Sequence, residues 1–152
     1  MYEYVEGKIG GIAVFFNGAL GGMVTPDVKD HSFEETKRIG VTTGKHVIRA
    51  LNAGEEYRVE RATAVRRIIT FPLENEKFKR LRKANVLRRK IYNNKVLSEV
   101  CLIDLGRIQA VTIPGELLPK LGLRIKSMIK AKYRMLICLG NDELGYQLQK
   151  KY

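Results

Sequence analysis

Short apolar runs, each closed by glycine, proline or asparagine, most constrain the fold of this chain. Their length is typical of β-strands, which usually have about 3–10 residues, and is far below the roughly 20 that a membrane-spanning helix needs. Stretches with helical spacing of apolar residues separate several of the runs. The runs lie at residues 12–16, 65–71, 97–105, 108–113 and 134–139. This alternation predicts an α/β fold in which helices pack on a mixed β-sheet.

Capping residues mark the start of the longest predicted helix. Glu35 lies three residues after Ser32, and this spacing forms a capping box that satisfies free backbone N–H groups. The helix is expected to run to about Leu51, with Gly54 as a left-handed stop just beyond it. The earlier run at residues 12–16 is bounded by glycines and is expected to form a buried strand.

The middle of the sequence predicts a strand, a helix and a turn. Residues 57–73 are expected to form the strand, which Pro72 ends. Residues 74–89 are expected to form the helix, although its apolar stripe is thin. Asn93 and Asn94 predict a turn.

The last third of the sequence predicts a hairpin, a helix and a final strand. Gly106 and Arg107 lie between two β-rich runs, which favours a hairpin. Apolar residues then repeat at helical spacing from 118 to 129, and lysines lie between them. Residues 134–139 form the last predicted strand.

Length and cysteine content limit the class of protein. The 152 residues suit one domain, so a single compact domain over residues 1–152 is expected. Cys101 and Cys138 each lie inside an apolar run, where a free thiol packs like a small hydrophobic group. The polar, acidic first residues do not resemble a signal peptide, so a cytoplasmic location is expected.

The chain is strongly basic, and the positive charge is concentrated in one segment. The formal net charge is +12, and residues 77–95 contain no acid. Such a segment either binds nucleic acid or forms a solvated basic surface. The solvated surface is the preferred interpretation, because only Phe78 and Tyr92 could stack on bases there. The basic residues are Lys77, Lys79, Arg80, Arg82, Lys83, Arg88, Arg89, Lys90 and Lys95.

Three polar, glycine-containing loops each follow a predicted strand. They lie around Thr25, at residues 114–116 and at residues 140–146. In open α/β sheets, functional sites gather beyond the carboxyl ends of strands. Glu116 is either a metal ligand, a base, or a carboxylate that stabilises the start of the next helix by about 0.3–1 kcal/mol. For Thr25 and Tyr146 the structural alternatives are a turn residue and a loop aromatic.

Other polar groups carry weaker signals. Asp142 and Glu143 are interpreted as solvated loop residues. His31 and His46 are the only histidines, and their spacing does not match a pair of metal ligands. The sequence contains no phosphate-binding glycine motif and no recognisable Ser-His-Asp set.

Four motifs follow one another along residues 11–147. They are Phe15-Phe16-Asn17-Gly18-Ala19 with Gly21-Gly22-Met23-Val24-Thr25-Pro26; Lys37-Arg38-Ile39-Gly40; Ile113-Pro114-Gly115-Glu116 with Leu121-Gly122; and Asn141-Asp142-Glu143-Leu144-Gly145-Tyr146. In this order they resemble the neutral/alkaline ceramidase family, and most closely its uncharacterised microbial ceramidase-like members. The resemblance implies a mixed α/β domain equivalent to the C-terminal half of the family's catalytic domain.

The resemblance also implies a zinc-dependent amide hydrolase. In the family, two histidines, a glutamate and a tyrosine hold one zinc ion. The glutamate of the Pro-Gly-Glu motif matches Glu116, and the tyrosine that ends the Asn…Gly-Tyr motif matches Tyr146. Thr25 matches the serine at the nucleophile position of ceramidases, and a threonine there departs from the family pattern.

The family's two histidine-bearing motifs are absent, and His31 and His46 do not fall in them. The chain is therefore expected to be inactive alone, with zinc bound only if other groups complete the site. Two kinds of partner are expected: a second copy in a homo-oligomer, or a separate chain that supplies the N-terminal half. The alternatives are a non-catalytic assembly module, because an unpaired sheet edge invites pairing, and a basic nucleic-acid-binding protein.

Overall fold

The structure is a computed structural model that describes residues 1–89 and 91–147. It has a mixed sheet and four helices, so the predicted α/β class is confirmed. The chain folds into two units, each held together by its own internal packing. Unit 1 comprises Met1–Phe16 and Val24–Arg58, and unit 2 comprises Asn17–Met23 and the residues from Val59 onward. The single domain expected over residues 1–152 stays a prediction.

Unit 1 contains two helices, α1 (Tyr2–Ile9) and α2 (Phe33–Asn52). Gly44 on α2 lies directly against Tyr4 on α1, and a Cβ atom at that position would meet the Tyr4 ring at 2.8 Å. Glycine therefore allows the two helices to approach closely. Helix α1 is not predictable from the sequence, because its apolar residues are too few for a clear helical pattern.

The N-terminus of α2 confirms half of the predicted capping box. The Ser32 hydroxyl accepts the Glu35 N–H at 3.1 Å. The Glu35 carboxylate instead accepts the Lys29 N–H at 3.0 Å and pairs with Arg38 at 2.6 Å. The predicted stop at Gly54 is wrong, because α2 ends at Ala53 in the right-handed region and Gly54 does not have a positive φ.

The predicted strand at residues 12–16 is also wrong. The segment has no regular structure, and Ile12 and Phe16 are 88% and 52% exposed. A strand needs a neighbouring strand to satisfy its backbone, and the described part of unit 1 contains only helices. The Ala13 N–H bonds to the Glu6 carboxylate at 2.9 Å instead.

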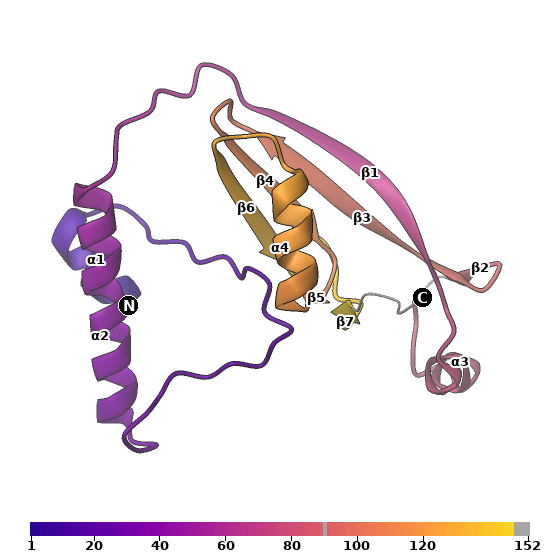
Figure 1. The fold of residues 1–152 in the computed structure, drawn as a ribbon. Helices are drawn as coiled ribbons and strands as arrows, with labels where there is room; N and C mark the ends of the chain where they lie inside the picture. Colours follow the sequence, from indigo (N-terminus) through magenta and orange to yellow (C-terminus); the bar gives the residue numbers. More distant parts are fainter. Residues whose placement is uncertain (90, 148–152) are drawn as a thin grey trace. The chain divides into compact units, whose positions relative to one another are not determined.

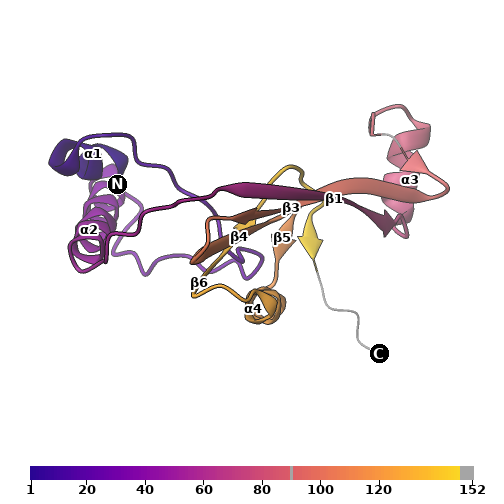
Figure 2. The same ribbon diagram turned by 90° about the horizontal axis from the view of Figure 1, so that it is seen from above.

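Unit 2 is built on a five-stranded sheet (Figures 1 and 2). The main order is β1 (Thr63–Pro72), β3 (Lys95–Asp104), β4 (Ile108–Ile113) and β6 (Tyr133–Cys138). Strand β3 is antiparallel to β1 and to β4, while β4 and β6 are parallel. The sheet is therefore mixed, as predicted, and β1, β3, β4 and β6 lie within about two residues of their predicted positions except for the start of β1.

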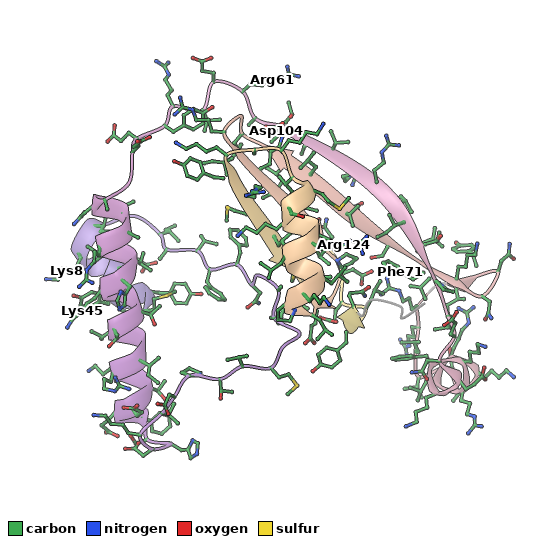
Figure 3. The ribbon with its side chains drawn as sticks, in the orientation of Figure 1. Lys8, Lys45, Arg61, Phe71, Asp104 and Arg124 are labelled. Atoms are coloured by element: carbon green, nitrogen blue, oxygen red, sulfur yellow. The ribbon has the colours of Figure 1, made fainter. Side chains whose placement is uncertain are left out.

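Two predicted turns have the geometry that their residues favour. Gly106 has a φ of 78° in the β3–β4 hairpin, and its N–H donates to the Asp104 carboxylate at 2.8 Å (Figure 3). Asn93 and Asn94 both have positive φ and join the short strand β2 (Ile91–Tyr92) to β3. Asparagine tolerates this left-handed conformation better than most residues, which explains the tight two-residue connection.

The helix predicted at residues 74–89 is shorter than expected. Helix α3 spans Glu76–Lys83, with the Asn75 side chain accepting the Lys77 N–H at its start. Asn85 has a φ of 58°, which ends the helix soon after Lys83. Lys90, one of the basic residues singled out above, lies outside the described residues.

Helix α4 (Pro119–Met128) connects β4 to β6 and packs on one face of the sheet (Figure 2). The buried core lies between them and consists of Ile113, Leu117, Ile129, Leu136 and Cys138. Burial of the Cys138 thiol is as predicted, whereas Cys101 is only partly buried. The described residues contain no helix that is both long enough and apolar enough to cross a membrane.

The face of the sheet opposite α4 also carries apolar side chains. Ile68, Leu97 and Met135 alternate with the core residues and point to this other face. They are 63%, 39% and 42% exposed, respectively. This face of the sheet therefore carries exposed apolar side chains in unit 2.

Burial on the two faces predicts different mutational costs. Replacing Leu136 with alanine should lower the free energy of unfolding by about 2–5 kcal/mol, because Leu136 is 9% exposed and its loss leaves a cavity. Ile68 lies on the same sheet and is 63% exposed, so Ile68→Ala should change the free energy of unfolding by less than about 0.5 kcal/mol. Urea unfolding followed by circular dichroism measures both, and equal effects of the two substitutions would contradict this assignment of the core.

The Glu35–Arg38 pair predicts a pH dependence for unit 1. The hydrogen bond from Arg38, with the Lys29 N–H, lowers the pKa of Glu35 from 4.5 to about 2. Because the folded pKa lies below the unfolded one, the pair stabilises α2 fully above about pH 4.5 and is lost as the pH falls toward 2. Far-UV circular dichroism should show helix loss over this range in the wild type and a flatter profile in Glu35→Gln.

The matched control for this experiment is Glu34→Gln, which changes the neighbouring carboxylate in the first turn of the same helix. Its pH profile should follow that of the wild type. If Glu35→Gln also kept the wild-type profile, the Glu35 interactions would not contribute to the acid stability of α2.

Candidate functional site

The parallel strands β4 and β6 end at the same edge of the sheet. The turn at residues 114–116 follows β4, and the loop at residues 139–145 follows β6. Backbone hydrogen bonds join them, from Gly140 N–H to Ile113 O at 3.1 Å and from Leu144 N–H to Pro114 O at 3.0 Å. These two loops therefore lie together beyond the carboxyl ends of strands, as predicted.

A third segment, Asn17–Met23, joins these loops within unit 2. The Gly21 N–H donates to Leu117 O at 2.8 Å, and the Cys138 N–H donates to Asn17 O at 2.9 Å. A Cβ atom at Gly21 would lie 2.7 Å from Leu117 O, so the close backbone approach requires glycine here. The three segments Asn17–Met23, 114–117 and 139–147 are called the strand-end loops below.

Glu116 and Tyr146 lie next to each other in the strand-end loops. Strand β5 (Glu116–Leu117) pairs in parallel with β7 (Tyr146–Gln147), and Glu116 and Tyr146 are direct partners in this register. The Glu116 N–H donates to Gly145 O at 3.0 Å. Directly paired residues point to the same face of a sheet, so the carboxylate and the phenol share one face.

The surroundings leave both groups accessible. Glu116 is half-buried, and Tyr146 is 51% exposed. The Tyr146 hydroxyl donates to the Met23 sulfur at 3.1 Å, which is a weak acceptor. A metal ion could displace this contact at little cost, because a thioether hydrogen bond is weaker than one to oxygen.

Thr25 belongs to unit 1, in the exposed segment before α2. It is therefore in a different unit from Glu116 and Tyr146, and its catalytic role stays a prediction. His31 and His46 also belong to unit 1 and are exposed.

The prediction that Asp142 is a solvated loop residue is wrong. Its carboxylate accepts hydrogen bonds from both terminal nitrogens of Arg89, one of them at 2.7 Å. It also accepts a hydrogen bond from the Ser98 hydroxyl at 2.6 Å. Ser98 is buried on β3. These contacts fasten the loop that carries Tyr146 to the sheet. The sequence shows no signal for the pair, because Arg89 and Asp142 are 53 positions apart.

Electrostatics in this cluster follow from the ion pair. The hydrogen bond from Arg89 holds the pKa of Asp142 well below its usual range, and the bonds from Ser98 and the Glu143 N–H act in the same direction. The same pairing raises the pKa of Arg89. Asp142 is therefore a charged anchor for the loop rather than a proton donor or acceptor near neutral pH.

Cys138 lies beneath the strand-end loops and is 3% exposed. Burial raises the pKa of its thiol, although backbone N–H groups of Leu117 and Leu20 donate to the sulfur and oppose this shift. A buried thiol with a raised pKa is a poor nucleophile. We therefore assign Cys138 a packing role, in which it joins β6 to two of the strand-end loops.

The ligands present do not amount to a complete zinc site. Within residues 1–89 and 91–147, no group of three or more His, Cys, Asp or Glu side chains is placed to hold a metal. Zinc in proteins takes three or four protein ligands, and Glu116 with Tyr146 supplies two oxygens. The roles of Glu116 and Tyr146 as metal ligands therefore stay predictions.

The Arg89–Asp142 pair predicts a strong energetic coupling. In a double-mutant cycle with Arg89→Ala and Asp142→Asn, we expect a coupling of about 1.5–3 kcal/mol in unfolding free energy, as for partly buried hydrogen bonds between charged groups. The control is the Arg66–Glu99 pair at 3.5 Å, whose arginine is 72% exposed. The coupling energy of this exposed pair should stay below about 1 kcal/mol. Equal coupling energies in the two pairs would refute the role of Arg89 and Asp142 in anchoring the loop.

Comparison with protein-family models, with curated proteins and with solved structures finds no match for this chain. The likeness to ceramidases therefore rests on the order of the four motifs. Segments from three of those motifs meet in the strand-end loops of unit 2.

Proposed function

We propose that this chain is the C-terminal half of a zinc-dependent amide hydrolase that resembles the ceramidases. Glu116 and Tyr146 are two of the zinc ligands in this proposal. The remaining ligands come from a partner chain or from a second copy, so the isolated chain is inactive. A catalytic role of Thr25 rests on the resemblance alone.

The direct pairing of Glu116 with Tyr146 is the observation that carries the proposal. The two residues come from separate loops, and a two-residue strand pair sets them opposite each other. Gly115 permits this pairing, since a Cβ atom there would lie 2.6 Å from Gly145 O. Two oxygen donors on one face, both accessible to solvent, are what a partly formed zinc site needs.

The chemistry follows from the type of metal. A zinc ion bound there would polarise an amide carbonyl and supply an activated water. The part of this chain in that reaction is to hold the metal through Glu116 and Tyr146, while Asp142 and Arg89 keep the loop of Tyr146 in place.

Free backbone groups on the outer strands and exposed apolar side chains of unit 2 support the need for a partner. Strands β1 and β6 are the outer strands of the main sheet, and outer strands leave backbone groups free for pairing. Exposed Ile68, Leu97 and Met135 lie on the face opposite α4. A partner layer on this face would bury the apolar side chains and complete a packed domain.

The test measures zinc retention with imidazole as a stand-in for the missing histidines. The purified chain is dialysed against micromolar zinc with and without imidazole, and its metal content is measured by elemental analysis. We expect close to one zinc per chain only when imidazole is present. Glu116→Gln and Tyr146→Phe should each weaken zinc binding by at least about tenfold, because each removes a ligand.

The matched control is Glu60→Gln, which neutralises an exposed carboxylate of the same unit. Its zinc content should equal that of the wild type. Equal zinc content in the wild type and Glu116→Gln would refute the assignment of Glu116 as a ligand.

The exposed apolar sheet face also favours a second candidate, a non-catalytic assembly module. Light scattering on the same samples separates the two functions. A stable oligomer without imidazole-dependent zinc binding would favour the assembly module. A monodisperse monomer would count against assembly with itself.

A further inference from the structure

Helix α3 is unusual in unit 2 because it contributes nothing to the buried core. None of its residues is buried, and its two apolar side chains, Phe78 and Leu81, are 45% and 41% exposed. An isolated helix of this length is marginal in water and usually depends on packing for its stability. A role of α3 is therefore to be expected from its surface rather than from packing in the core.

That surface is densely basic. Five of the eight residues of α3 are lysine or arginine, and three of them lie in its last turn. Further basic residues follow before and within the start of β3. Figure 3 shows side chains with nitrogen tips projecting around α3. The α3 surface is defined as Lys77, Lys79, Arg80, Arg82, Lys83, Arg88 and Lys95.

Few of these charges have a partner. Lys79 pairs with Glu76 at 2.7 Å, and Arg82 donates to the backbone oxygen of Arg89 at 3.0 Å. The other members of the α3 surface have no acidic partner among the described residues and are exposed. Like charges that are crowded together without counterions attract a polyanion.

The α3 surface also has an open hollow that is lined by three of its cations. The hollow has a volume of about 290 Å³ and is lined by Lys79, Arg82 and Lys83 of α3, with Leu73, Ile91 and Asn94 beside them. Among the residues that the structure describes, no acidic side chain lines it. Lysine and arginine side chains around an opening of this kind are typical of sites that bind phosphate groups.

An aromatic side chain lies on the β2–β3 hairpin, which also contributes Ile91 and Asn94 to the hollow. Tyr92 pairs directly with Lys95 in the β2–β3 register, so these two side chains share one face, and Tyr92 is 57% exposed. Exposed aromatic rings beside basic residues form stacking platforms for unpaired bases. A duplex hides its bases in the stack, so this combination fits single strands better.

The apolar residues of α3 argue against a lipid surface. Phe78 lines a separate hollow together with Phe71 and Val96 of the sheet, so part of its side chain lies against the sheet. A helix that docks on a membrane needs an outward apolar face to insert among the lipids. The outward face of α3 carries cations instead.

We propose that the α3 surface binds single-stranded nucleic acid, with the phosphates held by its lysines and arginines and a base stacked on Tyr92. This activity is independent of the zinc ligands and goes beyond the proposed hydrolase function. The solvated basic surface preferred from the sequence leaves the hollow and the unburied helix without an explanation.

The experiment measures fluorescence anisotropy of a labelled oligothymidylate of about 12 nucleotides, titrated with the full chain at several salt concentrations. We expect binding that weakens steeply with salt. The double variant Arg80→Gln/Lys83→Gln should bind at least about tenfold more weakly and should lower the salt slope by about 1.4, since each phosphate contact on a single strand contributes about 0.7. Tyr92→Ala should weaken binding by about fivefold or more, and Tyr92→Phe should restore it.

The control is Lys126→Gln/Lys130→Gln, which removes the same charge from exposed positions elsewhere in unit 2. It should bind like the wild type. Equal weakening in both double variants would overturn the proposal, because net charge alone would then explain binding. The proposal would also be overturned if the wild-type chain did not bind the oligonucleotide but bound phosphatidylserine vesicles or an acidic peptide through the same residues.

Discussion

The parallel pairing of β4 with β6 is the constraint on which the rest of unit 2 depends. It runs in register from Ile108 opposite Tyr133 to Ile113 opposite Cys138. Parallel strands need a crossover, and α4 provides it while covering the core. A slip of one residue would turn Leu136 and Cys138 away from α4, so burial fixes the register. The same register brings the loops after both strands to one edge of the sheet.

Backbone contacts then build the site on this edge. Glycines at positions 21 and 115 allow main chains to approach more closely than any side chain would permit. The positions of Glu116 and Tyr146 are thus set by hydrogen bonds of the backbone around them. Such a scaffold can hold two ligands in place without burying them, which leaves room for groups from elsewhere to approach.

Local signals in the sequence predicted much of unit 2, and tertiary effects explain the errors. The β3–β4 hairpin was predictable because Gly106 lies between two β-rich runs, and its positive φ meets the need of the turn. Residues 12–16 have the composition of a buried strand, but burial depends on a partner strand that the described part of unit 1 lacks. The two loops after β4 and β6 were predictable from their order after strands, whereas the strand expected before Asn17–Met23 is absent from the described residues. The anchor of Asp142 was not, because its partner Arg89 is distant in sequence.

Arg89 shows how one basic segment can serve two purposes. It is the one residue of the described basic segment whose charge is paired with a carboxylate of the strand-end loops, and its side chain is 27% exposed. Burying a cation without a partner would be costly, so the inward position requires the Asp142 charge. Lys79 pairs with Glu76, and the other described cations of the segment are exposed, where water screens their mutual repulsion. The described part of the segment therefore tolerates its density of positive charge by pairing Arg89 and Lys79 and solvating the other side chains. The solvated cations on the outward face are what leave the α3 surface open to a polyanion.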